Sequence, residues 1–285
     1  MLLSPEELSK TSVIDPQVLE YAKNNPQPPL NWDDWKAVRD GLALVSQQTL
    51  ALLGPTESTI VEQYQNIPMR DGVQSKLKIV KPVSSPVGGS PLIVFFFGGG
   101  WISGDIEAGT AFARAYALAR SLEEKLMHPI TGQFLCVPSI MTKEHVPEKY
   151  QPYFLSHEQN KDAPILPTDA LRSLFEHTSW DSTSYMRYPI LSKAPLSQQP
   201  PAYIQVDGMD PLRDEALIWD ELLKEAGVKT RVDLYPGCPH AHFGFMPGIE
   251  PTTKAIGDAM IGVGWLLGRS VTMQEGLAAM VPQTA

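Results

Sequence analysis

The fold is decided by the stretch Tyr203-Ile-Gln-Val-Asp207-Gly-Met-Asp210-Pro-Leu-Arg-Asp-Glu215, which joins a short apolar run to the start of a predicted helix over 211–226. Asp210 stands where an N-cap is expected, and Gly227 is the expected stop of that helix. A second apolar run, Val232-Asp-Leu-Tyr-Pro236, follows directly. Strand, helix and strand in this order predict a parallel β-α-β unit and an α/β fold class.

Upstream segments extend the same alternation. Leu92–Phe97 is unbroken and apolar, as in a strand buried on both faces, and Phe134–Pro138 is a second short run of this kind. Because a right-handed crossover connects parallel strands, we expect one mostly parallel sheet with Phe97 directly beside the strand Phe134–Val137. The predicted helices that flank this sheet cover 107–127, 168–178, 211–226 and 252–268.

Two further segments have their own patterns. Residues 60–80 alternate around Arg70-Asp71-Gly72, as a β-hairpin does. Residues 1–55 place apolar side chains at helical spacing and predict a helical segment at the N-terminus. Residues 139–200 hold many prolines and only one modest helical pattern, which predicts a lid-like insertion over the carboxyl ends of the strands.

Composition restricts the function classes. The chain has 285 residues, of which 43% are hydrophobic and 19% charged, enough apolar material for a sizeable core and too little charge for a disordered chain. The net charge of −9 argues against a nucleic-acid partner, which requires clustered Lys and Arg. Cys136 and Cys238 form neither a disulfide framework nor a metal-binding spacing, so a reducing compartment is expected.

The sequence also carries expectations about location. The N-terminus has no basic flank followed by a long apolar run, so we expect no secretory signal. No stretch approaches the roughly 20 apolar residues of a membrane span. A soluble cytoplasmic protein is therefore the default expectation.

The first candidate for chemistry is the glycine triplet Gly98-Gly99-Gly100, which follows the most apolar run. Backbone N–H groups without a neighbouring Cβ are suited to an oxyanion. A tight turn that needs positive φ is the alternative. A dinucleotide-binding loop fits less well, because Ser103 stands where a G-x-G-x-x-G pattern needs its third glycine.

The second candidate, Asp210, lies just after a predicted strand, where open α/β sheets place their ligand sites. It is able to orient a histidine, but an aspartate before a proline is also an ordinary helix cap, and both roles can coexist. The next three charged residues, Arg213, Asp214 and Glu215, are expected to form a solvated first turn with local ion pairs.

The third candidate is His240, in the loop Tyr235-Pro-Gly-Cys-Pro-His240-Ala-His242-Phe after another predicted strand. An exposed loop histidine is the simplest alternative. His240 and His242 also form a possible metal pair, but a site needs a third ligand, and the other histidines lack the spacing to supply one. We therefore expect no metal and no cofactor.

Glycine triplet, acid and histidine, each after a strand and in this order, resemble the hormone-sensitive-lipase-like α/β-hydrolases, the α/β-hydrolase fold-3 family. The resemblance covers roughly residues 60–268. It implies an α/β-hydrolase-like domain over 56–285 behind a helical N-terminal cap over 1–55. It also implies oxyanion donors at Gly98, Gly99 and Gly100, a triad acid at Asp210 and a triad base at His240, with His242 the weaker candidate.

The chain departs from the family pattern at two places. Phe97 stands where the family has a histidine before the glycines, and no serine in the sequence has glycine at both −2 and +2, so the G-x-S-x-G nucleophile is missing. Cys238 and Ser103 are weak candidates for a replacement nucleophile. Cys238 lies in the same loop as the base, and Ser103 lies in the loop that must bind the oxyanion.

An internal deletion near residue 118 explains the missing serine. The family reaches the equivalent of Phe134–Val137 through two further β-α units, for which about 60 residues are needed. Here one helix-like stretch, Glu107–Met127, fills the interval. The fold is then two inner strands short.

The resemblance implies a carboxylic-ester hydrolase for a small apolar metabolite, of the kind found in fungal-type secondary-metabolite biosynthesis. Its partner would be a small-molecule acyl or ester substrate, and the sequence does not indicate an oligomeric state. The alternative is a catalytically inactive relative or truncated remnant that lacks the nucleophile and at most binds a small ligand.

Overall fold

The computed structural model of the chain describes residues 2–26, 31–56, 58–69, 71–84, 92–100, 103–104, 106–107, 130–178, 181–185 and 187–279. The chain divides into two compact units. Unit 1 comprises residues 1–29 and 130–276, and unit 2 comprises residues 30–129 and 277–285.

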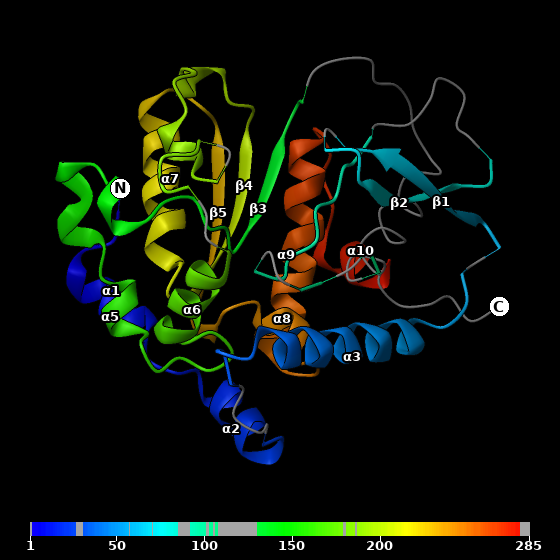
Figure 1. Cartoon of the computed structure of the whole chain (residues 1–285), viewed down its shortest axis with the longest axis horizontal. Coiled ribbons are helices and arrows are strands. Elements are labelled where there is room, and N and C mark those ends of the chain that lie inside the picture. Colours follow the sequence, from blue (N-terminus) through cyan, green and yellow to red (C-terminus); the bar gives the residue numbers. More distant parts are fainter. Residues whose placement is uncertain are drawn as a thin grey trace. The chain divides into compact units, whose positions relative to one another are not determined.

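The centre of unit 1 is a parallel three-stranded sheet in the order β3-β4-β5, shown in Figure 1. Its strands are β3 (Gln133–Cys136), β4 (Ala202–Met209) and β5 (Thr230–Pro239). Residues 133–136 pair with 202–205, and residues 202–207 pair with 230–235. The predicted parallel arrangement of these three runs is confirmed.

The helices of unit 1 follow the predicted pattern closely. The predictions over 168–178, 211–226 and 252–268 correspond to α6, α7 and α9. Helix α9 begins and ends two residues earlier than predicted. Helix α7 begins later than predicted, at Arg213, because the Asp210 carboxylate accepts from Leu212 N at 2.9 Å and forms a turn before it. Among the described residues, the α-helices outside 30–129 are α1 (Pro5–Thr11), α2 (Pro16–Asn24), α5 (Ser156–Gln159), α6 (Thr168–Thr178), α7 (Arg213–Glu225), α8 (His242–Phe245), α9 (Glu250–Leu266) and α10 (Met273–Ala278).

The segment 139–200 contains short 3-10 helices in addition to α5 and α6. Their bounds are η1 (Lys143–His145), η2 (Glu148–Tyr153), η3 (Pro189–Leu191) and η4 (Leu196–Gln198). Across the ranges that the structure describes, no helix is both long and apolar enough to cross a membrane.

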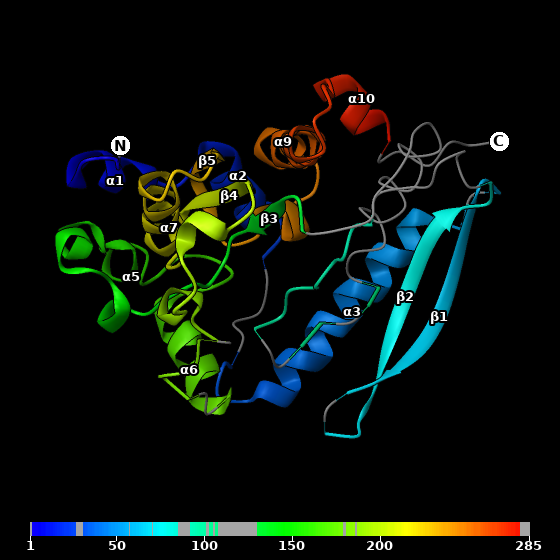
Figure 2. The same cartoon turned by 90° about the horizontal axis from the view of Figure 1, so that it is seen from above.

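The two faces of the sheet are covered by different helices. Figure 2 shows α7 and α9 on opposite sides of β3, β4 and β5. Alternate side chains of β4 explain this, because Ile204 and Val206 join an apolar cluster with Ile218 of α7. On the other face Gln205 donates to Ala255 O of α9 at 2.7 Å. Because β4 is buried on both faces, the polar side chain of Gln205 needs a hydrogen-bond partner inside the protein, and α9 provides it.

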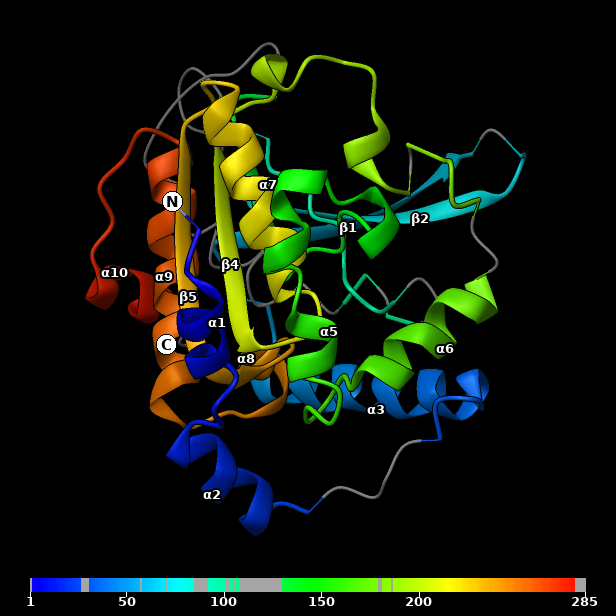
Figure 3. The ribbon, with the colours of Figure 1, turned by 90° about the vertical axis from the view of Figure 1, so that its left-hand side faces the viewer.

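The N-terminal segment lies against the ends of two strands. Figure 3 shows α1 beside β4 and β5. Leu8 is fully buried in the cluster that contains Ile204 and Ile218. Further along, Asp15 N donates to Gly237 O at 3.1 Å. The first helix of the predicted N-terminal segment is therefore part of the core of unit 1.

Replacement of Gly237 by alanine is expected to weaken this attachment. Gly237 has φ +70°, and an added Cβ would overlap Val13 O and Asp15 N. Backbone atoms cannot move aside cheaply, so we expect a loss of about 1–3 kcal/mol in unfolding free energy, measured by urea denaturation. Gly244→Ala is the matched control, since a Cβ there meets nothing within 4 Å. Equal stability of the two variants would contradict the packing described.

Unit 2 contains the predicted hairpin and one long helix. Strands β1 (Ile60–Pro68) and β2 (Gln74–Pro82) pair antiparallel around the predicted turn, which confirms the hairpin. Helix α3 covers Trp35–Leu53. Lys78 on β2 forms ion pairs with Glu62 at 3.1 Å and Glu107 at 2.5 Å.

Two predictions for unit 2 have different outcomes. The prediction of a buried strand over 92–97 is wrong: residues 92–98 have no regular structure, and Leu92 and Phe96 are 81% and 86% exposed. An apolar run becomes a strand only when a neighbour completes its hydrogen-bond ladder, and no ladder partner occurs for it among the described residues. The described strands form two sheets instead of the single sheet we expected. The predicted helix 107–127 lies outside the described residues apart from Glu107.

Candidate active site

Asp210 and His240 meet at the carboxyl ends of two neighbouring parallel strands. Asp210 follows β4, and His240 follows β5. His240 Nδ1 lies 2.7 Å from Asp210 Oδ2. Parallel strands bring their carboxyl ends to one edge of a sheet, which is why two residues 30 positions apart in the sequence come into contact.

The environment of this pair suits proton transfer. A carboxylate only accepts hydrogen bonds, so the ring donates through Nδ1 and keeps Nε2 available. Asp210 is almost fully buried, whereas 22% of the His240 side chain is exposed. Burial acts to lower the pKa of His240, but the charge and hydrogen bond of Asp210, with a further contribution from Asp207, raise it above 6.5.

A second acid–histidine pair lies close by in the sequence, with Asp207 in β4 and His242 at the start of α8. His242 Nδ1 lies 2.9 Å from Asp207 Oδ1, and both side chains are fully buried. Burial is the main cause that raises the pKa of Asp207, opposed by His242. Ala241, at φ +53°, lies between the two histidines in the left-handed region. His240 is therefore the histidine that contacts Asp210, and His242 contacts Asp207.

The start of α7 differs from the sequence prediction. Arg213, Asp214 and Glu215 were expected to be solvated, yet each is at most 1% exposed. The first turn of α7 follows a strand that is buried on both faces, so its side chains enter the protein instead of the solvent. The available signal was a run of three consecutive charged residues that begins three positions after the candidate acid, because buried charges need partners.

Glu215 holds the chain after β3. Its Oε2 atom accepts from Ile140 N at 2.7 Å and Met141 N at 3.0 Å. Burial raises the pKa of Glu215 to about 8, although the two backbone hydrogen bonds act to lower it. The carboxyl group therefore fixes the loop that leaves the carboxyl end of β3.

Replacement of Glu215 by glutamine is expected to change how stability depends on pH. The folded pKa lies above the unfolded value, so this group's contribution is present below pH 4.5 and is lost as pH rises to about 8. Glutamine keeps an acceptor for the two amides and does not titrate. Urea unfolding at about pH 5 and about pH 8.5 should show wild type losing stability relative to E215Q at the higher pH. A difference that does not change with pH would contradict this assignment.

The glycine triplet belongs to unit 2. Gly99 and Gly100 have φ of +144° and +57°, and a Cβ on Gly99 would overlap Ser103 O. Ser103 N and Oγ both donate to Gly99 O, at 3.0 and 2.7 Å. Gly99 and Ser103 thus close a tight turn in which glycine is required at position 99. Trp101, Ile102 and Asp105 lie outside the described residues.

The structure gives no support to the substitute nucleophiles. Burial raises the pKa of Cys238 to about 12, which keeps its thiol protonated at neutral pH. Burial also raises the pKa of Cys136. The Ser103 hydroxyl donates to Gly99 O. Within the described ranges, no group of three or more Cys, His, Asp and Glu side chains is arranged to hold a metal ion.

Comparisons with known proteins agree with this architecture. A family model described as alpha/beta hydrolase fold matches residues 108–244. Versiconal hemiacetal acetate esterase of Dothistroma septosporum is 30% identical over 201 residues, which are 69% of this chain and 59% of the relative. Esterase LipI of Mycobacterium tuberculosis is 30% identical over 168 residues, 57% of this chain and 48% of the relative. The chain thus spans about half to three-fifths of the length of these curated relatives.

Solved structures share the fold. Vibralactone cyclase superimposes with a TM-score of 0.78 and 22% identity, covering 91% of this chain and 96% of that one. A thermostable esterase from Pseudomonas putida gives a TM-score of 0.64 and 17% identity, covering 96% and 98%. The fold is that of the α/β-hydrolases. The family model and the esterase relatives support the α/β-hydrolase fold-3 family, the hormone-sensitive-lipase-like group that the motifs of this chain resemble.

Proposed function

We propose that this protein carries the acid–base part of a carboxylic-ester hydrolase site, with Asp210 as the acid and His240 as the base. The observation that carries the proposal is the 2.7 Å contact between the Asp210 carboxylate and His240 Nδ1 at the edge where two parallel strands end. The order of the motifs along the chain supports the same roles.

The proposed chemistry follows from the groups present. His240 Nε2 takes a proton from the attacking hydroxyl and later returns it to the leaving alcohol. Asp210 holds the ring in the tautomer that leaves Nε2 free and offsets the imidazolium charge. Gly98, Gly99 and Gly100 are the proposed donors to the oxyanion, by the family resemblance.

The proposed substrate is the ester of a small apolar metabolite. The names of the relatives, an acetate esterase and a second esterase, support this class. A place in secondary metabolism and a cytoplasmic location belong to the proposal. We also propose that the chain divides into a helical cap over 1–55 and a hydrolase domain over 56–285, with a lid-like insertion over 139–200.

A second candidate function is favoured by one observation in the sequence. No serine stands in a G-x-S-x-G context, so this chain lacks the family's nucleophile. We propose a deletion near residue 118 as the cause, with two inner strands lost together with the serine. On this alternative the chain is an inactive relative that at most binds a small ligand.

An ester assay combined with organophosphate labelling separates the two candidates. The purified chain is expected to show no covalent adduct by intact mass, because the reagent needs an activated serine. Residual hydrolysis of an activated short-chain ester, if observed, should resist the reagent and should fall in His240→Ala. A rate unchanged in His240→Ala would refute the base role. Stoichiometric labelling would refute the missing nucleophile, and peptide mapping would identify the serine.

A further inference from the structure

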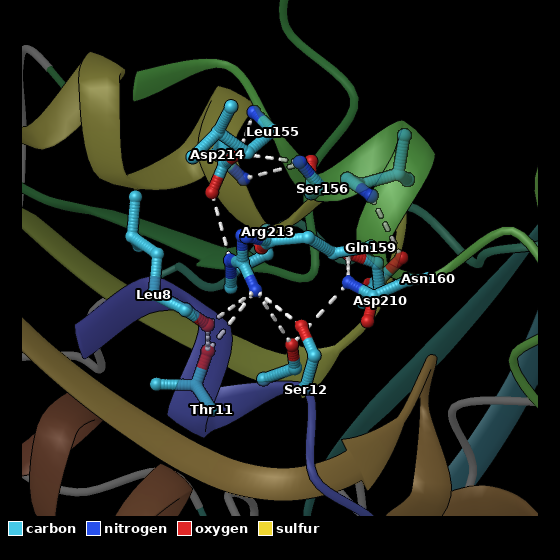
Figure 4. A network of polar contacts seen from close by, with 12 residues as sticks. Leu8, Thr11, Ser12, Leu155, Ser156, Gln159, Asn160, Asp210, Arg213 and Asp214 are labelled. Carbon is cyan, nitrogen blue, oxygen red and sulfur yellow. Dashed lines mark hydrogen bonds and ion pairs between the residues drawn. The ribbon is translucent and has the colours of Figure 1, made fainter. Parts of the chain in front are cut away.

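Arg213 is the centre of a buried polar network beside the candidate acid, shown in Figure 4. Its side chain is 1% exposed. Every guanidinium nitrogen donates a hydrogen bond. Nε donates to Asp214 Oδ1 at 2.7 Å, and Nη2 donates to Gln159 Oε1 at 2.6 Å. Nη1 has four acceptors at 2.7–3.2 Å, which are Leu8 O, Thr11 Oγ1, Ser12 Oγ and Gly208 O. One side chain thus joins the N-terminal segment, α5 and the end of β4.

The loop that carries Asp210 is held by this network at several backbone atoms. Gly208 O accepts from Arg213 at 3.2 Å and from Asn160 Nδ2 at 3.4 Å. Asp210 O accepts from Asn160 Nδ2 at 2.9 Å, and Pro211 O accepts from Ser156 Oγ at 2.6 Å. The backbone around Asp210 is therefore held by contacts from outside its own loop, while the carboxylate accepts from Leu212 N within the loop and contacts His240.

Asp214 balances the charge of Arg213 and extends the network. Its Oδ2 atom accepts from Leu155 N and Ser156 N, both at 2.6 Å, at the start of α5. The buried Arg213 guanidinium and Asp214 carboxylate compensate one another's charge. The other guanidinium nitrogens and the second carboxylate oxygen also have hydrogen-bond partners. The segment around α5 lies inside the predicted lid-like insertion, yet these contacts make it a support for the acid loop.

We propose that Arg213 is a positioning residue for Asp210, and that docking of residues 8–12 against its guanidinium completes the geometry of the acid–base pair. Residues 8–12 supply three of the six acceptors, and Ser9 Oγ also accepts from Gln159 Nε2 at 2.8 Å. The inference deepens the proposed function, because it presumes that Asp210 acts on His240.

Two opposite effects make the proposal testable through His240. The charged groups that act on His240 are Asp210 and Asp207, both at the end of β4. Loss of a nearby cation alone would raise the pKa of a histidine, whereas loss of an aligned carboxylate lowers it. A downward shift therefore reports misplacement of Asp210, and not a change of local charge.

The experiment is an NMR pH titration of His240 in the full chain carrying Thr11→Val and Ser12→Ala. This pair removes two acceptors of Arg213 without changing any charge. We expect the titration midpoint of His240 to move down relative to wild type. Thr253→Val is the matched control, since Thr253 Oγ1 donates to Ile249 O in the preceding helical turn and lies outside the Arg213 network. That variant should titrate as wild type does.

Arg213→Lys provides the second arm. Lysine keeps the charge but cannot serve all six acceptors of the planar guanidinium, so the His240 midpoint is expected to move down in this variant as well. An unchanged His240 midpoint in both Arg213→Lys and the double variant would overturn the proposal. The readout requires no turnover: a downward shift supports the inference even if no form of the protein hydrolyses an ester, and failure of the proposed function is detected separately by the ester assay.

Discussion

A form of this chain that carries two β-α units with a G-x-S-x-G elbow near residue 118 is expected to hydrolyse an activated acetate ester roughly 10⁴-fold or more faster than the 285-residue chain. The acid–base pair is already assembled at 2.7 Å, so the added serine supplies the part that the sequence lacks. Transcript or genomic sequence around the codons for residue 118 would show whether such a form is encoded.

The control for that experiment is the same longer form with its elbow serine replaced by alanine. Its rate should return to the level of the 285-residue chain, because residual catalysis from binding and oxyanion stabilisation does not need the serine. Equal rates for the longer form and the 285-residue chain would show that the elbow is not what limits turnover.

Asp210→Asn in the longer form is expected to lower the hydrolysis rate by about 10⁴-fold, because asparagine stabilises the wrong histidine tautomer and carries no charge. Steady-state kinetics with the activated ester measure the change. Asp220→Asn is the matched control. Asp220 is also a buried aspartate, on α7, but it pairs with Lys224 at 2.5 Å and does not contact His240. A comparable loss in both variants would assign the effect to stability instead of catalysis.

Much of unit 1 is predictable from the sequence because its signals are local and agree with each other. The runs at Tyr203–Asp207 and Val232–Pro236 are short and apolar, and a capped helix separates them, so a parallel pairing is the simple outcome. The contact of Asp210 with His240 then follows from topology, since both residues come directly after neighbouring parallel strands.

The wrong prediction of a buried strand at Leu92–Phe97 has a different physical origin. Apolar composition indicates that a segment would be stable when buried, but a strand also needs partners for its backbone N–H and C=O groups. Whether those partners exist depends on segments elsewhere in the chain. A strand prediction made from the run alone cannot contain that information.

The burial of Arg213, Asp214 and Glu215 was missed for a related reason. Charged residues in a first helical turn are usually solvated, and the exceptions depend on long-range partners. Here the partners are the N-terminal segment for Arg213, the start of α5 for Asp214 and residues 140–141 for Glu215. None of these is near α7 in sequence, so periodicity and local spacing could not identify them.

The most direct test of the central claim, that Asp210 and His240 form a working acid–base pair, is the NMR pH titration of His240 in the chain and in Asp210→Asn. The account predicts a midpoint above 6.5 in the unmodified chain, because the Asp210 carboxylate outweighs the effect of burial. It predicts a lower midpoint in Asp210→Asn, where burial acts with only Asp207 opposing it. The same His240 midpoint in both proteins would contradict the account.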